Sequence, residues 1–179
     1  MDSLLGAQIG VIGASDATAQ ELEHARAVGL GLARSGALLI TGGLGGVMLA
    51  ACEGAHQGAG STVGILPGCD RAQANDHVDV AIPTGMGELR NGLIVRCCEA
   101  LIAIGGGWGT LSEIALALRA GRPVVGLESW DLPELESSMR RVEDPDQAVT
   151  LALEFAVSFR AHPSPVSGAP PTLANECPR

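Results

Sequence analysis

The segment that decides the fold is residues 100–113, which read Ala-Leu-Ile-Ala-Ile-Gly-Gly-Gly-Trp-Gly-Thr-Leu-Ser-Glu. The continuous apolar run from Ala100 to Ile104 is typical of a strand that is covered on both faces in a parallel sheet. The glycines that follow permit a tight turn, and the apolar spacing from Gly109 to Arg119 predicts a helix. The segment therefore predicts a strand, a glycine-rich turn and a helix, which is the repeating unit of an α/β sheet.

The same unit recurs on both sides of this segment. The predicted strands are 8–14, 37–41, 62–66, 78–82, 100–104 and 123–127, and the predicted helices are 18–35, 47–57, 86–98, 109–119 and 144–159. Ser15 and Asp16 are the expected caps of the first helix, and Asp144 with Pro145 begins the last. Strands that alternate with helices at this spacing predict a Rossmann-like, doubly wound parallel sheet in three α/β/α layers.

The length of the chain fits one domain. With 179 residues, we expect a single nucleotide-binding domain over residues 1–159 that buries one core. Residues 160–179 are rich in proline and lack periodicity, so they are predicted to form a poorly packed C-terminal tail.

The composition excludes several classes of function. The formal net charge is −9, and all 11 basic residues are arginines because lysine is absent. A chain without lysine cannot tether pyridoxal phosphate or supply the lysine of a Walker-type loop. The acidic balance disfavours a nucleic-acid partner, and no apolar stretch is long enough to span a bilayer, so we expect a cytoplasmic protein. The cysteines and histidines show no metal-ligand spacing, so no metal site is expected.

Ligands of open α/β sheets bind beyond the carboxyl ends of the strands, where three loops stand out. These loops are Gly13–Asp16, Thr41–Met48 and Gly105–Glu113. In the third loop, glycines bring main-chain amides close to a ligand and Thr110 adds a hydroxyl at the start of a helix. Because the positive end of the helix dipole lies at the same place, this loop predicts an anion site that needs no lysine.

The predicted phosphate- and nucleotide-binding residues are Ser15, Gly42, Gly43, Gly45, Gly46, Asn91, Gly106, Gly107, Gly109 and Thr110. The alternative is that the glycines only permit close packing of helices on the sheet. Neither glycine turn has the GxGxxG pattern with an acidic residue at the proper offset, which makes a dinucleotide dehydrogenase the weaker hypothesis. Trp108 is either a flat lid for a heterocycle or a locally packed side chain.

Arg90 and Glu113 are the candidate catalytic residues. Glu113 lies one helical turn after Thr110, so its carboxylate can face a ligand at the turn and hold a ribose hydroxyl or activate water. A first-turn acid that stabilises the helix dipole is an equal alternative. Arg90 lies near the expected mouth of the site, whereas Arg96, six residues on, points to another face of its helix. A solvated surface arginine is the alternative for each.

These motifs resemble the Lonely Guy superfamily. The resemblance rests on GGLGGVM at 42–48, Arg90-Asn91 and GGGWGTLSE at 105–113, and it covers about residues 8–128. It implies a Rossmann-like sheet, usually dimeric, that holds the phosphate of a nucleotide-like ligand at the glycine turn. We therefore expect a homodimer or homotetramer that binds a small molecule.

In the phosphoribohydrolases of this superfamily an arginine and a glutamate are catalytic, and they match Arg90 and Glu113. The resemblance implies that Arg90 orients a nucleoside 5′-monophosphate while Glu113 supports attack of water on the anomeric carbon, which breaks the N-glycosidic bond without a cofactor. Gly105 replaces the family proline and Asn91 the family lysine, which brings the chain closer to the molybdenum cofactor carrier proteins.

Two functional hypotheses follow. The leading one is a protein that binds a phosphorylated nucleotide-like molecule and hydrolyses a nucleoside 5′-monophosphate. The alternative is a non-catalytic carrier or storage protein for a phosphorylated pterin such as molybdenum cofactor. A pyridoxal-dependent lysine decarboxylase, a label long attached to this superfamily, is excluded by the absence of lysine.

Overall fold

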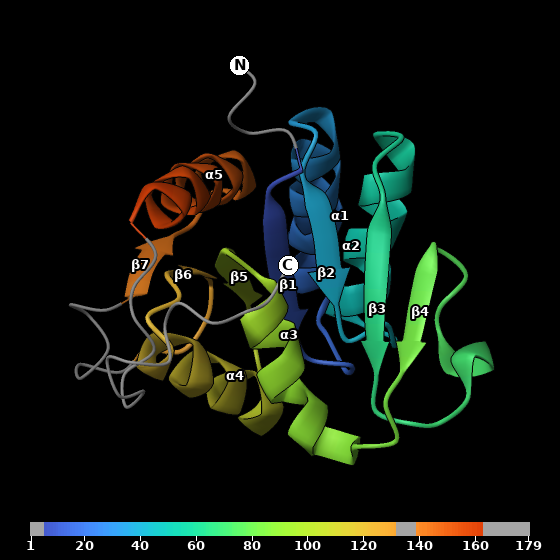
Figure 1. Ribbon diagram of the computed structural model, residues 1–179. Helices are drawn as coiled ribbons and strands as arrows, with labels where there is room; N and C mark the ends of the chain where they lie inside the picture. Colours follow the sequence, from blue (N-terminus) through green and yellow to red (C-terminus); the bar gives the residue numbers. More distant parts are fainter. Residues whose placement is uncertain (1–5, 132–138, 163–179) are drawn as a thin grey trace.

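A computed structural model describes residues 6–131 and 139–162 of the chain. Its centre is a seven-stranded sheet in the order β4-β3-β2-β1-β5-β6-β7, in which all neighbouring strands are parallel (Figure 1). The strands are β1 (Gln8–Gly13), β2 (Leu38–Thr41), β3 (Thr62–Leu66), β4 (Val80–Pro83), β5 (Ala100–Ile104), β6 (Val124–Leu127) and β7 (Met139–Val142).

Helices cover both faces of this sheet (Figure 1). One face carries α1 (Ala19–Arg34), α2 (Val47–Gln57) and α5 (Pro145–Ala161), and the other carries α3 (Asn91–Cys97) and α4 (Trp108–Arg119). Side chains alternate along β1, so that Ile9 and Val11 enter one core and Ile12 enters the other. The predicted Rossmann-like fold with three α/β/α layers is confirmed.

One strand has no counterpart in the sequence prediction. β7 pairs with β6 at the edge of the sheet, but its interior residues Arg140 and Arg141 are exposed. Only Met139 and Val142 at its ends are buried. Because two charges interrupt the segment, it lacks the apolar run by which the other strands were recognised.

The first helix begins differently from the prediction. Its N-cap is Thr18, whose hydroxyl accepts a hydrogen bond from the Glu21 amide at 3.2 Å while the Glu21 carboxylate accepts one from the Thr18 amide at 2.7 Å. Ser15 and Asp16 were the wrong caps, because a glutamate three residues on completes this reciprocal capping box only for Thr18. The predicted cap of α5 is confirmed, since Asp144 accepts from the Gln147 amide at 2.9 Å.

The predicted helix over 86–98 is divided into two parts. A short 3-10 helix, η2 (Gly87–Arg90), precedes α3. Gly85 and Gly87 have φ values of +65° and +57°, which interrupts helical geometry before Arg90. A second 3-10 turn, η1 (Arg71–Gln73), lies in the stretch that was predicted as a loop.

At the C-terminus, α5 extends to Ala161, two residues beyond the predicted end of the domain. Residues 163–179 of the predicted tail lie outside the described residues.

The order of the strands creates a place for a ligand. From β1 the chain moves outward through β2 and β3 to β4, and it then returns to β5 and moves outward in the other direction to β7. The loops that follow β1 and β5 therefore diverge at the carboxyl ends of neighbouring strands, which is where open α/β sheets form a binding crevice.

Candidate functional site

A cavity of about 510 Å³ opens at this reversal of strand order. Its walls come from the loops after β1, β2 and β5 together with η2 and the first turns of α3 and α4. Eight predicted site residues line it, namely Ser15, Gly42, Arg90, Asn91, Gly107, Gly109, Thr110 and Glu113. The chain thus brings together residues that are up to about a hundred positions apart in the sequence.

Four of the predicted glycines, at 43, 45, 46 and 106, lie outside this lining. Gly46 has φ +61°, and a Cβ atom there would lie 2.3 Å from the carbonyl oxygen of Ala14. A Cβ atom at Gly43 would lie 3.0 Å from the Cα of Gly64. At these two positions the structure shows close packing of the backbone, which is the alternative considered for the glycines.

The turn between β5 and α4 presents unpaired amides. Gly105 fixes its start, because its amide donates to the Leu127 carbonyl at 3.1 Å and its carbonyl accepts from the Ser129 hydroxyl at 2.7 Å. No side chain caps the helix at Gly107. Within the described part of the chain, the amides of residues 107–110 have no hydrogen-bond partner, and the next one, of Leu111, donates to the Gly107 carbonyl. These amides and the positive end of the helix dipole form a cradle of donors, residues 107–110, at the cavity, an arrangement that can bind an anion.

Arg90 and Glu113 face one another in the cavity wall. Both are buried, with 9% and 6% of their surface exposed, and Arg90 Nη1 lies 4.0 Å from Glu113 Oε1. Gly42 makes room for the guanidinium, because a Cβ atom there would lie 2.7 Å from Arg90 Nη2. The Nε atom of Arg90 is buried and has no partner among the described residues. A buried donor of this kind favours a ligand with an acceptor oxygen.

Burial shifts the pKa values of this pair. Desolvation raises the pKa of Glu113 to about 7, and the positive charge of Arg90 only partly opposes this. Desolvation likewise lowers the pKa of Arg90, against the attraction of Glu113 and Glu88. Glu113 therefore gains or loses its proton near neutral pH, which is the property of a general acid or base and also lets it sit beside an anion in its neutral form.

Asn91 joins α3 to α4 at the cavity. Its Nδ2 atom donates to the Ser112 hydroxyl at 3.4 Å, and that hydroxyl donates to the Gly109 carbonyl at 2.8 Å. Asn91 Oδ1 is buried without a partner in the described residues. The residue thus offers one acceptor towards a ligand while its amide group is held in place.

The cavity is also lined by residues that were not predicted as site residues, namely Leu44, Met48, Pro67, Glu88 and Ser112. Leu44, Met48 and Ser112 lie in two of the loops that the sequence singled out. Glu88 could have been found because it lies two residues before Arg90, whereas Pro67 needed the topology. Trp108 lines the rim with 80% of its surface exposed, and its ring lies 5.6 Å from that of Trp130.

Two features are absent from residues 6–131 and 139–162. No group of three or more histidine, cysteine, aspartate or glutamate side chains is placed there to hold a metal ion. None of the helices in these ranges is both long enough and apolar enough to cross a membrane.

A doubly wound parallel sheet with a cavity at its switch point defines a Rossmann-like α/β protein. The chain belongs to the SLOG cluster4 family, which it matches over residues 6–156. This confirms the resemblance to the Lonely Guy superfamily.

Similar proteins place the chain in the branch of this superfamily near the molybdenum cofactor carrier proteins. It is 43% identical over 150 residues to an uncharacterised protein of Archaeoglobus fulgidus, covering 84% of this chain and 97% of the relative. The molybdenum cofactor binding protein of Rippkaea orientalis is 38% identical with a TM-score of 0.77, over 82% of this chain and 94% of that one. The molybdenum cofactor carrier protein of Chlamydomonas reinhardtii is 34% identical with a TM-score of 0.77, over 84% of this chain and 98% of that one.

Proposed function

We propose that this protein is a non-catalytic carrier for a phosphorylated pterin such as molybdenum cofactor. The observation that carries the proposal is the run of unpaired amides at residues 107–110, which faces a cavity that also holds Arg90. A cavity of about 510 Å³ lies within the usual size range for small-molecule sites. The alternative of the two sequence hypotheses thus becomes the preferred one.

The anion is held by main-chain amides together with one arginine. In a chain of net charge −9, the overall field repels an anionic ligand, so the attraction has to be local. The cradle supplies oriented dipoles whose donors are unsatisfied without a ligand, and Arg90 supplies a buried positive charge with a free Nε donor. Hydrogen bonds from such donors to a phosphate are charge-assisted and therefore strong.

Glu113 and Asn91 suit the remainder of such a ligand. The raised pKa of Glu113 allows its carboxyl group to be protonated near neutral pH and to donate a hydrogen bond to an anion rather than repel it. Asn91 Oδ1 is an acceptor for a ring or side-chain N–H. These are binding roles, and they require no bond to break.

The similarity to two molybdenum cofactor-binding proteins over most of each chain supports the carrier function.

One observation favours hydrolysis of a nucleoside 5′-monophosphate as a second candidate. Glu113, with a pKa of about 7, lies 4.0 Å from Arg90, and such a carboxyl group can activate water beside a bound nucleotide.

Replacement of Trp108 tests the cradle. Trp108→Pro removes one amide donor at the first position of α4, where proline is compatible with the helix, and the extended Gly107 (ψ −164°) tolerates a following proline. Trp108→Ala is the matched control, because it removes the same side chain and keeps the amide. We expect the proline variant to bind inorganic phosphate or AMP about 10- to 100-fold more weakly than the alanine variant in calorimetry. Equal affinities would contradict the cradle.

Co-purification distinguishes cargo from substrate. We expect the full chain, isolated from a host that makes molybdenum cofactor, to carry molybdenum and a phosphorylated pterin in equal amounts. Arg90→Gln should lose both. Incubation with AMP and with an N6-substituted AMP should release no free base. Release of base that Glu113→Gln abolishes, with binding retained, would overturn the carrier proposal in favour of the hydrolase.

We also propose that the chain forms a homo-oligomer through the face of α3 and α4. Exposed apolar side chains lie on these helices and on the segment just before α3. They are Leu89 of η2, which is 79% exposed, Met86 just before η2, Leu93 of α3 and Leu116 of α4. Sedimentation should show a dimer or a tetramer for the native chain, and Leu89→Glu should shift it towards the monomer. A monomeric native chain would contradict this part of the proposal.

A further inference from the structure

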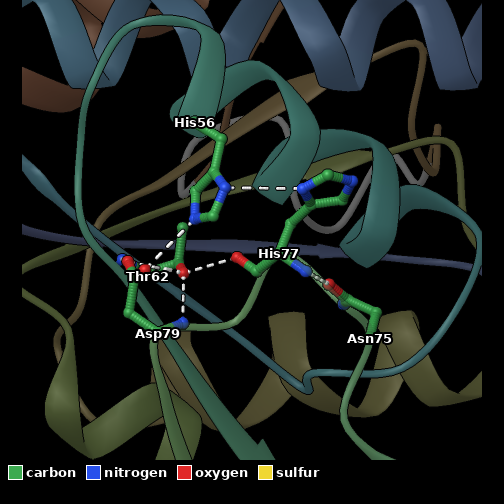
Figure 2. Close-up of polar contacts among 5 residues, drawn as sticks. All are labelled: His56, Thr62, Asn75, His77 and Asp79. Carbon is green, nitrogen blue, oxygen red and sulfur yellow. Dashed lines mark hydrogen bonds and ion pairs between the residues drawn. The ribbon is translucent and has the colours of Figure 1, made fainter.

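A polar cluster lies at the opposite edge of the sheet from the cavity. It consists of His56 in the last turn of α2, Thr62 at the start of β3, and His77 and Asp79 just before β4 (Figure 2). Because α2 returns from the carboxyl end of β2 to the amino end of β3, all four residues meet where the strands begin. None of them lines the cavity.

Asp79 is held firmly by β3. The amide of Thr62 donates to Asp79 Oδ2 at 2.7 Å, and the amide of Asp79 donates to Thr62 Oγ1 at 2.9 Å. The Thr62 hydroxyl donates to Asp79 Oδ2 at 3.1 Å, and His56 Nε2 lies 3.1 Å from Asp79 Oδ1. The carboxylate is therefore a firmly oriented acceptor.

Asp79 in turn decides which nitrogen of His56 carries the proton. Asp79 Oδ1 lies 3.1 Å from His56 Nε2, and an ionised carboxylate can only accept. The proton of neutral His56 is thus assigned to Nε2, and its Nδ1 atom keeps a free lone pair. This lone pair faces His77, whose Nδ1 atom lies 3.4 Å away (Figure 2).

The separation of the two Nδ1 atoms matches that of two ligands on one ion. Zinc binds imidazole nitrogen at about 2.0–2.1 Å with tetrahedral geometry, which places two such nitrogens about 3.3 Å apart. The observed separation of 3.4 Å agrees with this spacing. Metal-binding histidines also commonly donate their second N–H to a carboxylate, as His56 does to Asp79.

We propose that His56 and His77 bind one divalent transition-metal ion of the zinc type through their Nδ1 atoms. Asp79 orients His56 and does not touch the ion, and water fills the remaining positions. In the metal-free chain the His77 Nδ1–H donates to His56 Nδ1; on metal binding this proton moves through solvent to Nε2 of the same ring, so both ligands stay neutral. With two protein ligands, the site exchanges its ion more readily than a closed structural zinc site with four.

Calorimetric titration of the full chain with Zn²⁺ tests this site. We expect one ion per chain, with at least about 10-fold weaker binding in His56→Ala and in His77→Ala and a loss of about 10- to 100-fold in Asp79→Asn. His24→Ala is the matched control, because His24 pairs with Glu128 far from this cluster, and it should bind zinc like the native chain. Exposed Cys69 and Cys97 are other groups to which zinc could bind, and if the ion binds at the histidines, Cys69→Ser and Cys97→Ser should leave the titration unchanged.

A second measurement needs no variant, so it keeps the test decisive if a histidine variant fails to fold. Nitrogen-15 spectra of the histidine rings report protonation and metal binding at each nitrogen. Zinc should shift Nδ1 of His56 and of His77 and leave the rings of His24 and His162 unchanged. Unshifted Nδ1 signals, or zinc affinity that survives loss of either histidine, would overturn the proposal. Neither result bears on the carrier function, which depends on the other edge of the sheet.

Discussion

The two edges of the sheet treat their polar groups in opposite ways. At the carboxyl edge, buried atoms of Arg90 and Asn91 and the amides of residues 107–110 have no partner in the described chain. At the amino edge, Thr62 and Asp79 are joined by several hydrogen bonds although Asp79 is exposed. Buried donors and acceptors are therefore left without partners at the carboxyl edge, whereas at the amino edge even the exposed carboxylate of Asp79, which water could have served, is hydrogen-bonded.

This difference supports a ligand site at the carboxyl edge, because a buried group without a hydrogen-bond partner costs about 1–3 kcal/mol unless something else binds it. The cluster at the amino edge ties β3 to β4 and to the end of α2 through its own hydrogen bonds, whether or not a metal ion is bound.

The largest effect is expected at the glycine turn that supports the cavity. Gly46→Ala places a Cβ atom 2.3 Å from the Ala14 carbonyl at a residue with φ +61°, so strain and overlap together should lower the free energy of unfolding by about 3 kcal/mol. Gly45→Ala is the matched control, because a Cβ atom at Gly45 meets nothing within 4 Å. Its change should stay within about 0.5 kcal/mol in urea titrations. Equal stabilities would show that the turn relaxes freely.

The second effect concerns Glu113 and pH. The pKa of Glu113 rises from 4.5 to about 7 on folding, so the folded chain holds this proton more tightly than the unfolded chain does. Ionisation then destabilises the fold; the loss is absent below about pH 4.5, accumulates up to about pH 7 and is complete above it. It amounts to about 3 kcal/mol. Glu113→Gln should lose about that much less stability between pH 4.5 and pH 8 than the native chain. Parallel pH profiles would contradict the raised pKa.

The smallest effect is expected at the amino edge. Asp79→Asn weakens the hydrogen bonds to Thr62 and His56 and should lower the free energy of unfolding by about 1 kcal/mol at pH 7. Because the pKa of Asp79 is lowered in the folded chain, its contribution is present above its ordinary value of 3.8 and is lost as the pH falls through the folded pKa. Asp76→Asn is the control, since Asp76 has no hydrogen bond within the described residues. A similar loss in both variants would mean that charge alone is responsible.

The sequence predicted most of the fold because each local signal was strong. The apolar run of β5 and its glycine turn identified one βα unit, and equal signals identified its neighbours. β7 escaped because Arg140 and Arg141 interrupt it, and its place is set by pairing with β6. The first helix cap was misassigned because Ser15 and Thr18 are both good caps, and only Thr18 has Glu21 as its partner.

For the candidate site, the sequence predicted the residues of the glycine turn together with Arg90 and Glu113, but not their surroundings. Pro67 lines the cavity only because β3 lies beside β2, which itself pairs with β1. Of the glycines, Gly42 and Gly46 look equivalent in sequence, yet the first accommodates Arg90 and the second packs against Ala14.

The sequence alone determines the layered α/β architecture, the absence of lysine chemistry and the glycine turn before α4. These depend on periodicity, composition and local backbone conformation, which act over a few residues. The packing of the whole chain makes Glu113 a weak acid and brings the Nδ1 atoms of His56 and His77 to 3.4 Å from each other. Desolvation and contact between distant segments depend on how the whole chain packs, and no spacing along the chain encodes them.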